Sequence, residues 1–380
     1  MSDDLDTVRR DPVSDPGQQT AARSGWARAI PAIVVVAVLA ALPFMSVRIP
    51  VVFSGELSSP GVLNLLALCL VFGALALTYD LLFGFTGLLS FGHALYFALG
   101  VYVTAIAVTE FGWSLLAAVG LTMVVGLIVP IVLGAISLRV GDIAFAMVTL
   151  AFAQAGHIFV MRDPLRLTGG EEGLALAYQR LPGIFVGVFN TKYVYWLALG
   201  FAVLVYVVSR WAVDSRPGRI WQAIRENEQR VEVIGLEPYG FKLASFVVSS
   251  FLAALGGVVY VLLVGGAHPG ITAATFTLTL LVMVVLGGTG TLWGAVLGGV
   301  LYTYLNNRLV SLSNSATVQD LPDVLSRPLS EPLFILGALF VVLVMFFPGG
   351  IAGLRDTAVG DRLRRLLGRL VPAREGADDG

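Results

Sequence analysis

The stretch GFTGLLSFGHALYFALGVY, residues 84–102, is apolar enough to lie in a lipid bilayer, yet it is not a plain lipid-facing helix. It also contains residues that such a helix does not need, namely four glycines, a threonine, a serine and a histidine. Glycine and polar side chains at membrane depth either let helices pack closely or line a path for a solute. The rest of the chain has to decide between these two roles.

Composition defines the class of protein. Of 380 residues, 57% are hydrophobic and 13% are charged, against about 25% charged in a typical soluble domain. The mean hydropathy is +0.85, and apolar stretches of about 18 to 25 residues, long enough to cross ~30 Å of hydrocarbon, recur along the chain. The sequence therefore predicts an all-α polytopic membrane protein. With a net charge of -1 and no long basic block, no nucleic-acid partner is expected.

We predict about eight to ten transmembrane helices, counting Gly-broken or re-entrant segments. The expected spans are 29–47, 62–83, 86–108, 113–138, 143–161, 193–211, 242–264 and 332–348, with a longer apolar stretch at 276–305. Together they are expected to form one transmembrane domain over residues 29–350. The polar residues 1–28 are expected to be a disordered tail, and residues 351–380 form an Arg-rich tail.

Lys and Arg gather in the two tails and in the loop at 214–241, which predicts that all three are cytoplasmic. The loop at 161–192 and the connection at 265–275 then lie outside. These locations constrain how often residues 276–305 cross the membrane, because a single crossing there would place the Arg-rich tail outside. We therefore expect a broken or re-entrant segment that bends at Gly287-Gly288-Thr289-Gly290.

The expected bend has a counterpart earlier in the chain. Residues 84–89 and 287–292 share the pattern G-x-T-G-x-L, and each follows an apolar run. Gly-interrupted segments at matching points of two halves are typical of the midplane site of transporters, so we predict an internal repeat and a solute pathway. The alternative is close helix packing through small residues alone. The predicted pathway residues are Asn64, Thr86, Gly87, Ser90, Gly92, His93, Gly288, Thr289 and Gly290.

A zwitterionic solute needs donors for its carboxylate and acceptors for its ammonium. The backbone N–H groups at Gly87 and Gly290 can serve the carboxylate if these glycines begin broken helices. Asp80 lies near the cytoplasmic end of the second span, where its carboxylate can reach interfacial water. His93 is either functional or a structural residue that bonds a neighbouring carbonyl. The three scattered histidines and the single Cys69 predict no metal site and no internal disulfide.

The loop at 214–241 is predicted to form a short amphipathic helix. Pro217 and Gly218 fit its start and Gly235 its end, while apolar residues recur near helical spacing with charges between them. Such a helix at the membrane face is either a docking element for another protein or a solvated surface helix.

Four segments in this order resemble the LivM-type permease family of branched-chain amino acid ABC importers. They are GLLSFGHALYFALGVY, TGGEEGL at 168–174, AIRENEQRVEVIGL at 223–236 and LGGTGTLWGAVLG at 286–298. The resemblance covers roughly residues 60–350. It implies a multi-pass protein of the cell membrane that pairs with a LivH-type permease, two cytoplasmic ATPases and an extracytoplasmic binding protein.

The resemblance also implies that residues 219–236 dock into a groove of the ATPase. The implied docking residues are Arg219, Ala223, Ile224, Arg225, Glu226, Asn227, Glu228, Arg230 and Gly235. No cofactor or catalytic residue is expected in the chain itself. A phosphate-binding loop needs G-x-x-x-x-G-K-[ST], and the two lysines, Lys192 and Lys242, lie outside any such pattern. ATP would be bound by the partner subunits.

The loop at 161–192 is a candidate contact for the binding protein, or else simply a solvated loop. Its GGEEG segment, with Glu171 and Glu172, modestly favours an amino acid over urea as the solute. Urea-type permeases tend to have an aromatic residue and Asn after the glycine pair, as in GGFNG. Three functions therefore remain open: an importer permease for branched-chain or related amino acids, the same machine for urea or a short amide, and an ion-coupled carrier. The carrier is disfavoured because intramembrane acids are scarce.

Overall fold

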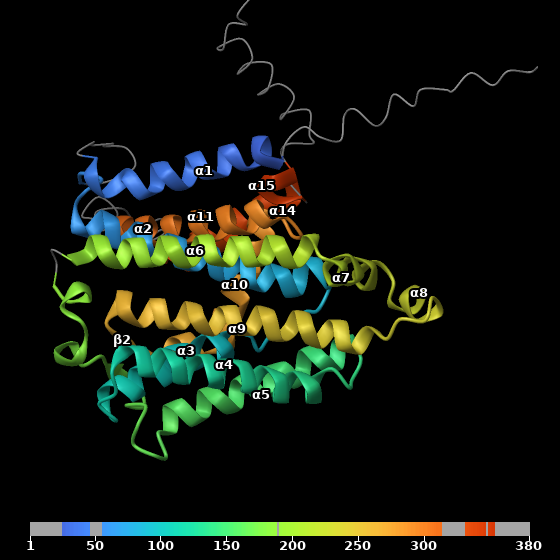
Figure 1. Cartoon of the computed structure of the whole chain (residues 1–380), viewed down its shortest axis with the longest axis horizontal. Coiled ribbons are helices and arrows are strands. Elements are labelled where there is room, and N and C mark those ends of the chain that lie inside the picture. The colour runs from blue at the N-terminus through green and yellow to red at the C-terminus, as the bar shows by residue number, and fades with distance from the viewer. Residues whose placement is uncertain (1–24, 46–54, 188–189, 314–330, 347–348, 354–380) are drawn as a thin grey trace, which may run out of the picture.

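The computed structural model describes residues 25–45, 55–187, 190–313, 331–346 and 349–353. Most of these residues lie in helices, so the predicted all-α fold is confirmed (Figure 1). The helices are α1 (Gly25–Ala41), α2 (Pro60–Asp80), α3 (His93–Thr109), α4 (Leu115–Ser137), α5 (Asp142–Arg162), α6 (Thr191–Asp214), α7 (Arg216–Glu226), α8 (Glu228–Val233), α9 (Pro238–Val264), α10 (Ala274–Gly287), α11 (Leu292–Ser313), α14 (Pro332–Phe346) and α15 (Gly350–Gly353).

Shorter pieces connect them. A π-helical turn, η2 (Leu81–Phe85), extends α2, and a 3-10 turn, η1 (Leu42–Phe44), follows α1. The remaining pieces are the 3-10 turns η3 (Tyr178–Arg180), η4 (Gly183–Phe185) and η6 (Pro269–Thr272) and the two-residue strands β1 (Leu174–Ala175) and β2 (Gly266–Ala267).

Five helices of the described residues are long and apolar enough to cross a membrane: α2 with η2, α4, α5, α6 and α9. They match five of the predicted spans. The span expected at 86–108 is shorter as a helix, because α3 begins only at His93. Helix α1 begins at Gly25, inside the expected N-terminal tail, and the last four-residue helix, α15, extends into the expected C-terminal tail. The rest of both tails lies outside the described residues.

The predicted break at 287–290 is confirmed. Helix α10 ends at Gly287, α11 begins at Leu292, and the two differ in direction by 120°. The returning arm is longer than expected, since α11 has 22 residues and packs along α2. A Cβ atom placed on Gly299 of α11 would lie 2.7 Å from the Cα atom of Gly73 in α2. Glycine is therefore needed where these two helices cross.

Helix α2 lies at the centre of the bundle and contacts α6, α9, α10 and α11, while α9 also packs on α3 and α4. The α3–α9 crossing depends on small residues as well. A Cβ atom on Gly257 of α9 would lie 2.6 Å from the backbone nitrogen of Val101 in α3. Gly100 in the opening stretch lies against Ala254 of α9. For this glycine the structure supports the packing role.

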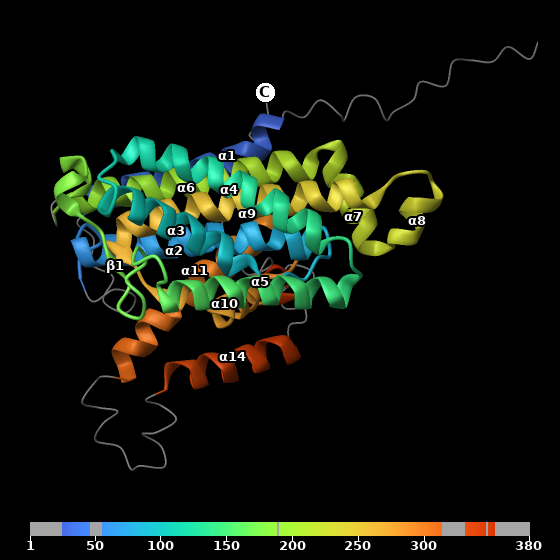
Figure 2. The same ribbon diagram turned by 90° about the horizontal axis from the view of Figure 1, so that it is seen from below.

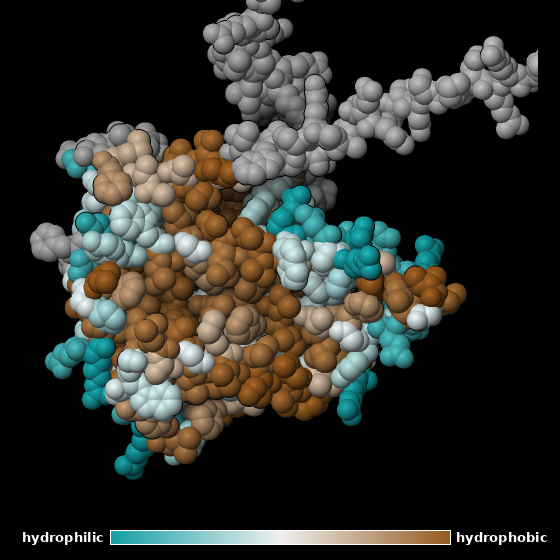
Figure 3. Space-filling model, in the orientation of Figure 1, coloured by the Kyte–Doolittle hydropathy of each residue, from teal (hydrophilic) through white to brown (hydrophobic). Residues whose placement is uncertain are grey.

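The two ends of the bundle carry different elements. At one end, β1 pairs antiparallel with β2, with Leu174 opposite Ala267, so the connections at 163–190 and 265–273 share a face. At the other end α7 and α8 project beyond the long helices (Figures 1 and 2). Hydrophobic surface spans the middle of the molecule, and hydrophilic residues gather toward the two ends (Figure 3). The relative sidedness of these loops therefore agrees with the sequence prediction.

Candidate functional site at the two helix breaks

The first break, between α2 and α3, leaves residues 86–92 outside any helix. Gly87 has a φ of +81°, a conformation that favours glycine. Non-helical backbone at membrane depth persists only where it is buried and bonded within the protein. Here side chains from other helices supply the bonds: the Oγ1 atom of Thr149 accepts from the N–H of Phe91 at 3.1 Å, and that of Thr277 accepts from the N–H of Ala94 at 3.0 Å.

His93 begins α3 and is completely buried. Its Nε2 atom lies 3.0 Å from the Oγ1 atom of Thr78, and the Thr78 hydroxyl donates its own hydrogen to the carbonyl oxygen of Leu75 at 2.7 Å. A hydroxyl has one hydrogen to donate, so Nε2 of His93 is the donor in this pair. The ring also packs edge-on against Tyr79, with 5.2 Å between centroids. These contacts favour the structural role for His93.

The second break meets the first at the same end of the bundle. The carboxylate of Asp80, the last residue of α2, accepts a hydrogen bond at 2.9 Å from the backbone N–H of Gly290. The guanidinium group of Arg225 in α7 donates to the carbonyl oxygen of Gly84 in η2. The two G-x-T-G-x-L segments are thus joined to each other and to the α7 helix. The predicted repeat did not include these contacts.

This placement corrects three expectations. Asp80 is completely buried, so the idea that it reaches interfacial water is wrong. It lies about 30 Å along α2 from the first residue, at 1.5 Å per residue, so the breaks lie closer to the α7 end of the bundle than to its middle. The N–H groups of Gly87 and Gly290 are already bonded, to the carbonyl oxygen of Phe83 and to Asp80 respectively. In this conformation neither is open to a solute carboxylate.

The other predicted pathway residues around the first break face the protein. Thr86 is 2% exposed, and its hydroxyl donates to the carbonyl oxygen of Leu81 at 3.2 Å. Ser90 is completely buried; its Oγ accepts from the N–H of Gly92 at 3.2 Å, and its carbonyl oxygen accepts from the Tyr79 hydroxyl at 3.2 Å. A Cβ on Gly92 would lie 2.9 Å from the carbonyl oxygen of Thr149. These residues stabilise the non-helical backbone of the first break.

Gly288 and Thr289 form the turn of the second break. Gly288 has a φ of +113°, and a Cβ there would lie 2.7 Å from the carbonyl oxygen of Gly349. The segment around α15 therefore packs directly on this turn. Thr289 is half-buried, which leaves its side chain as the part of this turn that is most open to a solute among the predicted hydroxyls.

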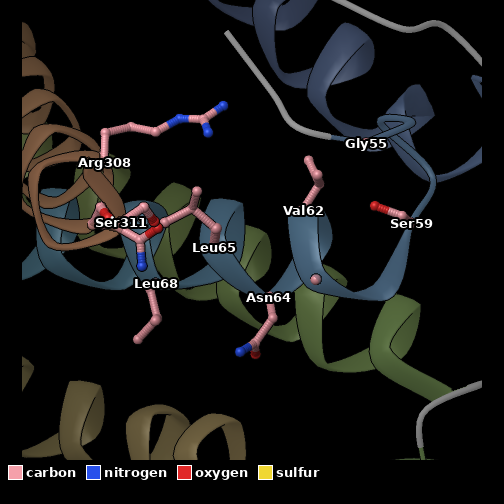
Figure 4. A pocket seen from close by; sticks show the side chains of 10 residues that line it. Gly55, Ser59, Val62, Asn64, Leu65, Leu68, Arg308 and Ser311 are labelled. Atoms are coloured by element: carbon pink, nitrogen blue, oxygen red, sulfur yellow. Dashed lines mark hydrogen bonds between the residues drawn. The ribbon is translucent and has the colours of Figure 1, made fainter. Parts of the chain in front are cut away.

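Asn64 lies far from both breaks. It is exposed near the start of α2, at the end opposite α7, and lines a cavity of about 320 Å³ between α2 and α11. Figure 4 shows that Asn64 and Arg308 lie on different sides of this cavity and do not point toward one another. The structure thus separates Asn64 from the remaining pathway residues.

The predicted docking segment forms two helices, α7 and α8, and not the single helix that was expected. Some of its residues hold the segment in place and others are exposed. Ser215 caps α7 by accepting from the N–H of Gly218 at 3.3 Å, and Asn227 caps α8 by accepting from the N–H of Arg230 at 3.0 Å. Glu228 forms an ion pair with Lys242 of α9 at 2.6 Å. Ile224 is buried. These residues, together with Arg225, attach the segment to the bundle.

The remaining predicted docking residues are Arg219, Ala223, Glu226, Arg230 and Gly235. All of them are exposed, as are Arg225 and Asn227. Next to them, Val233 is 87% exposed and Ile234 is 72% exposed. This apolar pair forms a hydrophobic patch at the tip of the projection (Figure 3). Exposed apolar side chains rimmed by charges are typical of a protein-binding surface.

Sequence reasoning missed several residues of the site. Thr78, Thr149 and Thr277 supply the bonds that hold the first break and His93, and Trp221 fixes α7 by donating from Nε1 to the carbonyl oxygen of Phe241 at 2.8 Å. The only signal for the threonines is that each is a polar residue inside an apolar helix. Their partners are far away in sequence, so the pattern alone does not reveal them.

The loop that follows α5, at the opposite end, is organised by Asp163. Its carboxylate accepts from the N–H groups of Leu167, Thr168 and Gly169 at 2.7, 2.9 and 3.1 Å. The hydrogen bond from the Thr168 backbone is the main reason that the pKa of Asp163 lies below its usual value. Glu171 and Glu172 are exposed beyond this turn. Among the described residues no group of three or more His, Cys, Asp and Glu side chains could hold a metal ion.

The molecule is a multi-pass helical protein whose spans are broken near one end of the bundle. A short helical projection is attached to these breaks, an arrangement that suits a transport permease. The chain belongs to the family described as the branched-chain amino acid transport system permease component, which it matches over residues 61–347. It is a permease subunit of an ABC importer.

Individual relatives agree. The chain is 25% identical over 319 residues to the high-affinity branched-chain amino acid transport system permease protein LivM of Escherichia coli, covering 77% of this chain and 70% of the relative. It is 24% identical over 312 residues to LivH of the same organism, covering 74% and 91%. It is 30% identical to the ribose import permease protein RbsC of Haemophilus influenzae, but over only 129 residues, which cover 32% and 38%. No solved structure matches the chain.

Proposed function

We propose that this permease forms half of the translocation pathway for branched-chain amino acids, paired with a second, LivH-like permease. The family match over residues 61–347 carries the proposal. The names of the relatives LivM and LivH support the cargo and the pairing. An extracytoplasmic binding protein would deliver the amino acid, and two cytoplasmic ATPase subunits would bind ATP and drive transport.

The α7–α8 projection is the proposed ATPase-docking surface. Its exposed tip combines the apolar pair Val233 and Ile234 with charges on α7, whereas the opposite end carries the longer loops. The positive residues of this loop support a cytoplasmic location. Both chain termini would then be cytoplasmic too. Helix α15 packs at the same end through Gly288. The C-terminal part of α1 bonds Tyr195 near the start of α6, so the N-terminal end of α1 points toward the α7 end.

Uptake of labelled leucine, urea and ribose tests the cargo in cells that lack only this chain. Selective loss of ATP-dependent leucine uptake, restored by the intact gene, is expected. Loss of urea or ribose uptake in its place would retain the importer and overturn the amino-acid cargo. Unchanged leucine uptake in a strain without other leucine importers would contradict the proposal.

Docking is tested by the substitution Val233→Glu, which places a charge in the apolar tip. We expect it to lower co-purification of the ATPase and leucine uptake by about tenfold or more, because charges are excluded from the core of an interface. Val140→Glu is the matched control, since Val140 is 42% exposed in the α4–α5 connection, at the end where Tyr239 of α9 contacts Ala135. Equal loss of ATPase from both variants would argue against a docking surface at α8.

A further inference from the structure

Arg225 was expected to face the ATPase, and it is exposed, but its guanidinium group also reaches the membrane domain. Its guanidinium group donates to the carbonyl oxygen of Gly84. A Cβ on Gly87 would lie 3.2 Å from Cγ of Arg225, and one on Gly290 would lie 2.7 Å from its Nη1 atom. One side chain of α7 therefore touches both helix breaks.

Asp80 forms the second connection at the same place. Its Oδ1 atom accepts from the N–H of Gly290, whereas its Oδ2 atom is buried and has no hydrogen-bond partner among the described residues. A buried carboxylate is costly unless charge or hydrogen bonds compensate for its loss of water. Gly84, whose carbonyl oxygen accepts from Arg225, also lies against this carboxylate, since a Cβ atom on Gly84 would clash with Oδ1 of Asp80. Asp80 thus joins the end of α2 to the α10–α11 turn, with Arg225 as its nearby cation.

We propose that Arg225 and Asp80 form a latch that transmits movement of the docking helix to both helix breaks. Arg225 links α7 to η2, and Asp80 links the adjoining turn of α2 to Gly290. When the ATPase displaces α7, the first and second breaks move together. Both residues are positioning residues that set how much solute is carried per ATP, and neither contacts the solute. This inference rests on the proposed function of α7–α8.

The latch can be removed without detaching α7. Trp221 still bonds the carbonyl oxygen of Phe241, and Glu228 still pairs with Lys242, so two other contacts hold the segment to α9. Arg225→Gln removes the charge and is the primary variant. Arg225→Lys keeps a charged donor and should restore part of the effect. Arg139→Gln is the matched control, because Arg139 is exposed in the α4–α5 connection, outside the docking segment, and loses the same charge.

The experiment uses the complete importer in proteoliposomes, with its binding protein and labelled leucine. ATP hydrolysis and leucine uptake are measured together, along with the ATPase that co-purifies and the thermal unfolding midpoint. We expect Arg225→Gln to lower leucine carried per ATP by about tenfold, within the range typical of coupling between two sites. Arg139→Gln should keep both this ratio and the amount of bound ATPase.

Asp80→Asn tests the other half of the latch, since the amide keeps an acceptor for Gly290 but loses the charge. It should also lower the ratio, and the double variant should be no worse than the poorer single variant, because the two residues act as a unit. An unchanged ratio in Arg225→Gln, or fully additive effects in the double variant, would overturn the latch. Loss of co-purified ATPase only from α8 variants, with an unchanged ratio, would leave the docking proposal standing alone.

Discussion

The two G-x-T-G-x-L segments share a pattern but are stabilised in different ways. In the first, the chain leaves α2 through a π-helical turn and stays non-helical until His93. Short-range bonds such as that from Thr86 to Leu81 hold it together with distant threonine hydroxyls, those of Thr149 and Thr277. In the second, a four-residue turn reverses the chain and depends on distant groups, namely Asp80 and the segment around α15. The pattern therefore marks where a helix breaks, whereas the fold decides what stabilises the break.

The largest difference in stability is expected from alanine at one positive-φ glycine of each break, Gly288 and Gly87. Gly288→Ala forces a side chain into a φ of +113° and against the carbonyl oxygen of Gly349 at 2.7 Å. Backbone strain and overpacking should together destabilise the protein by about 3 kcal/mol or more. Gly87→Ala, at a φ of +81°, meets the flexible stem of Arg225 and should cost only about 1–2 kcal/mol. The unfolding midpoints of the two purified variants measure these losses of stability, and equal losses in the two variants would contradict the comparison.

A smaller difference is expected from removing the polar side chain that supports each break. Asp80→Ala leaves the N–H of Gly290 unbonded and should cost about 2 kcal/mol, whereas Thr86→Val removes one neutral hydrogen bond and should cost about 1 kcal/mol. Hydrogen exchange of the peptide spanning 285–295 should accelerate in Asp80→Ala only. Equal acceleration in Thr86→Val would show that the second break does not depend specifically on Asp80.

The smallest effect on stability is expected from cysteine at the two threonines of the motif. Thr86 is 2% exposed and Thr289 is half-buried, and the native Cys69 is buried and can be replaced by alanine. Thr289→Cys should react with a small thiol reagent while Thr86→Cys stays protected, because labelling requires access to the thiolate. Slower labelling of Thr289→Cys in the presence of leucine would place it on the pathway. Labelling of Thr86→Cys at the same rate would contradict the difference between the breaks.

Part of the candidate site could be predicted from the sequence, and the reason is local. The break at 287–290 follows from span length, charge parity and adjacent glycines, all of which are read within one segment. The start and end of the docking segment follow from Pro217 and Gly235 in the same way, but its division into α7 and α8 at Asn227 was not predicted. The roles assigned to Asn64, Arg225 and Asp80 were less accurate, because each depends on which distant helix lies beside it.

The sequence by itself determined the membrane class, most of the spans, the position of both helix breaks and the side of the bundle on which the loops lie. These features depend on the cost of placing polar groups in hydrocarbon, which each segment incurs on its own. Only the tertiary structure decided that the breaks meet at the α7 end, since Asp80 and Gly290 are 210 residues apart and Arg225 and Gly84 are 141 residues apart. A buried carboxylate or guanidinium group takes whichever partner the packed helices place beside it.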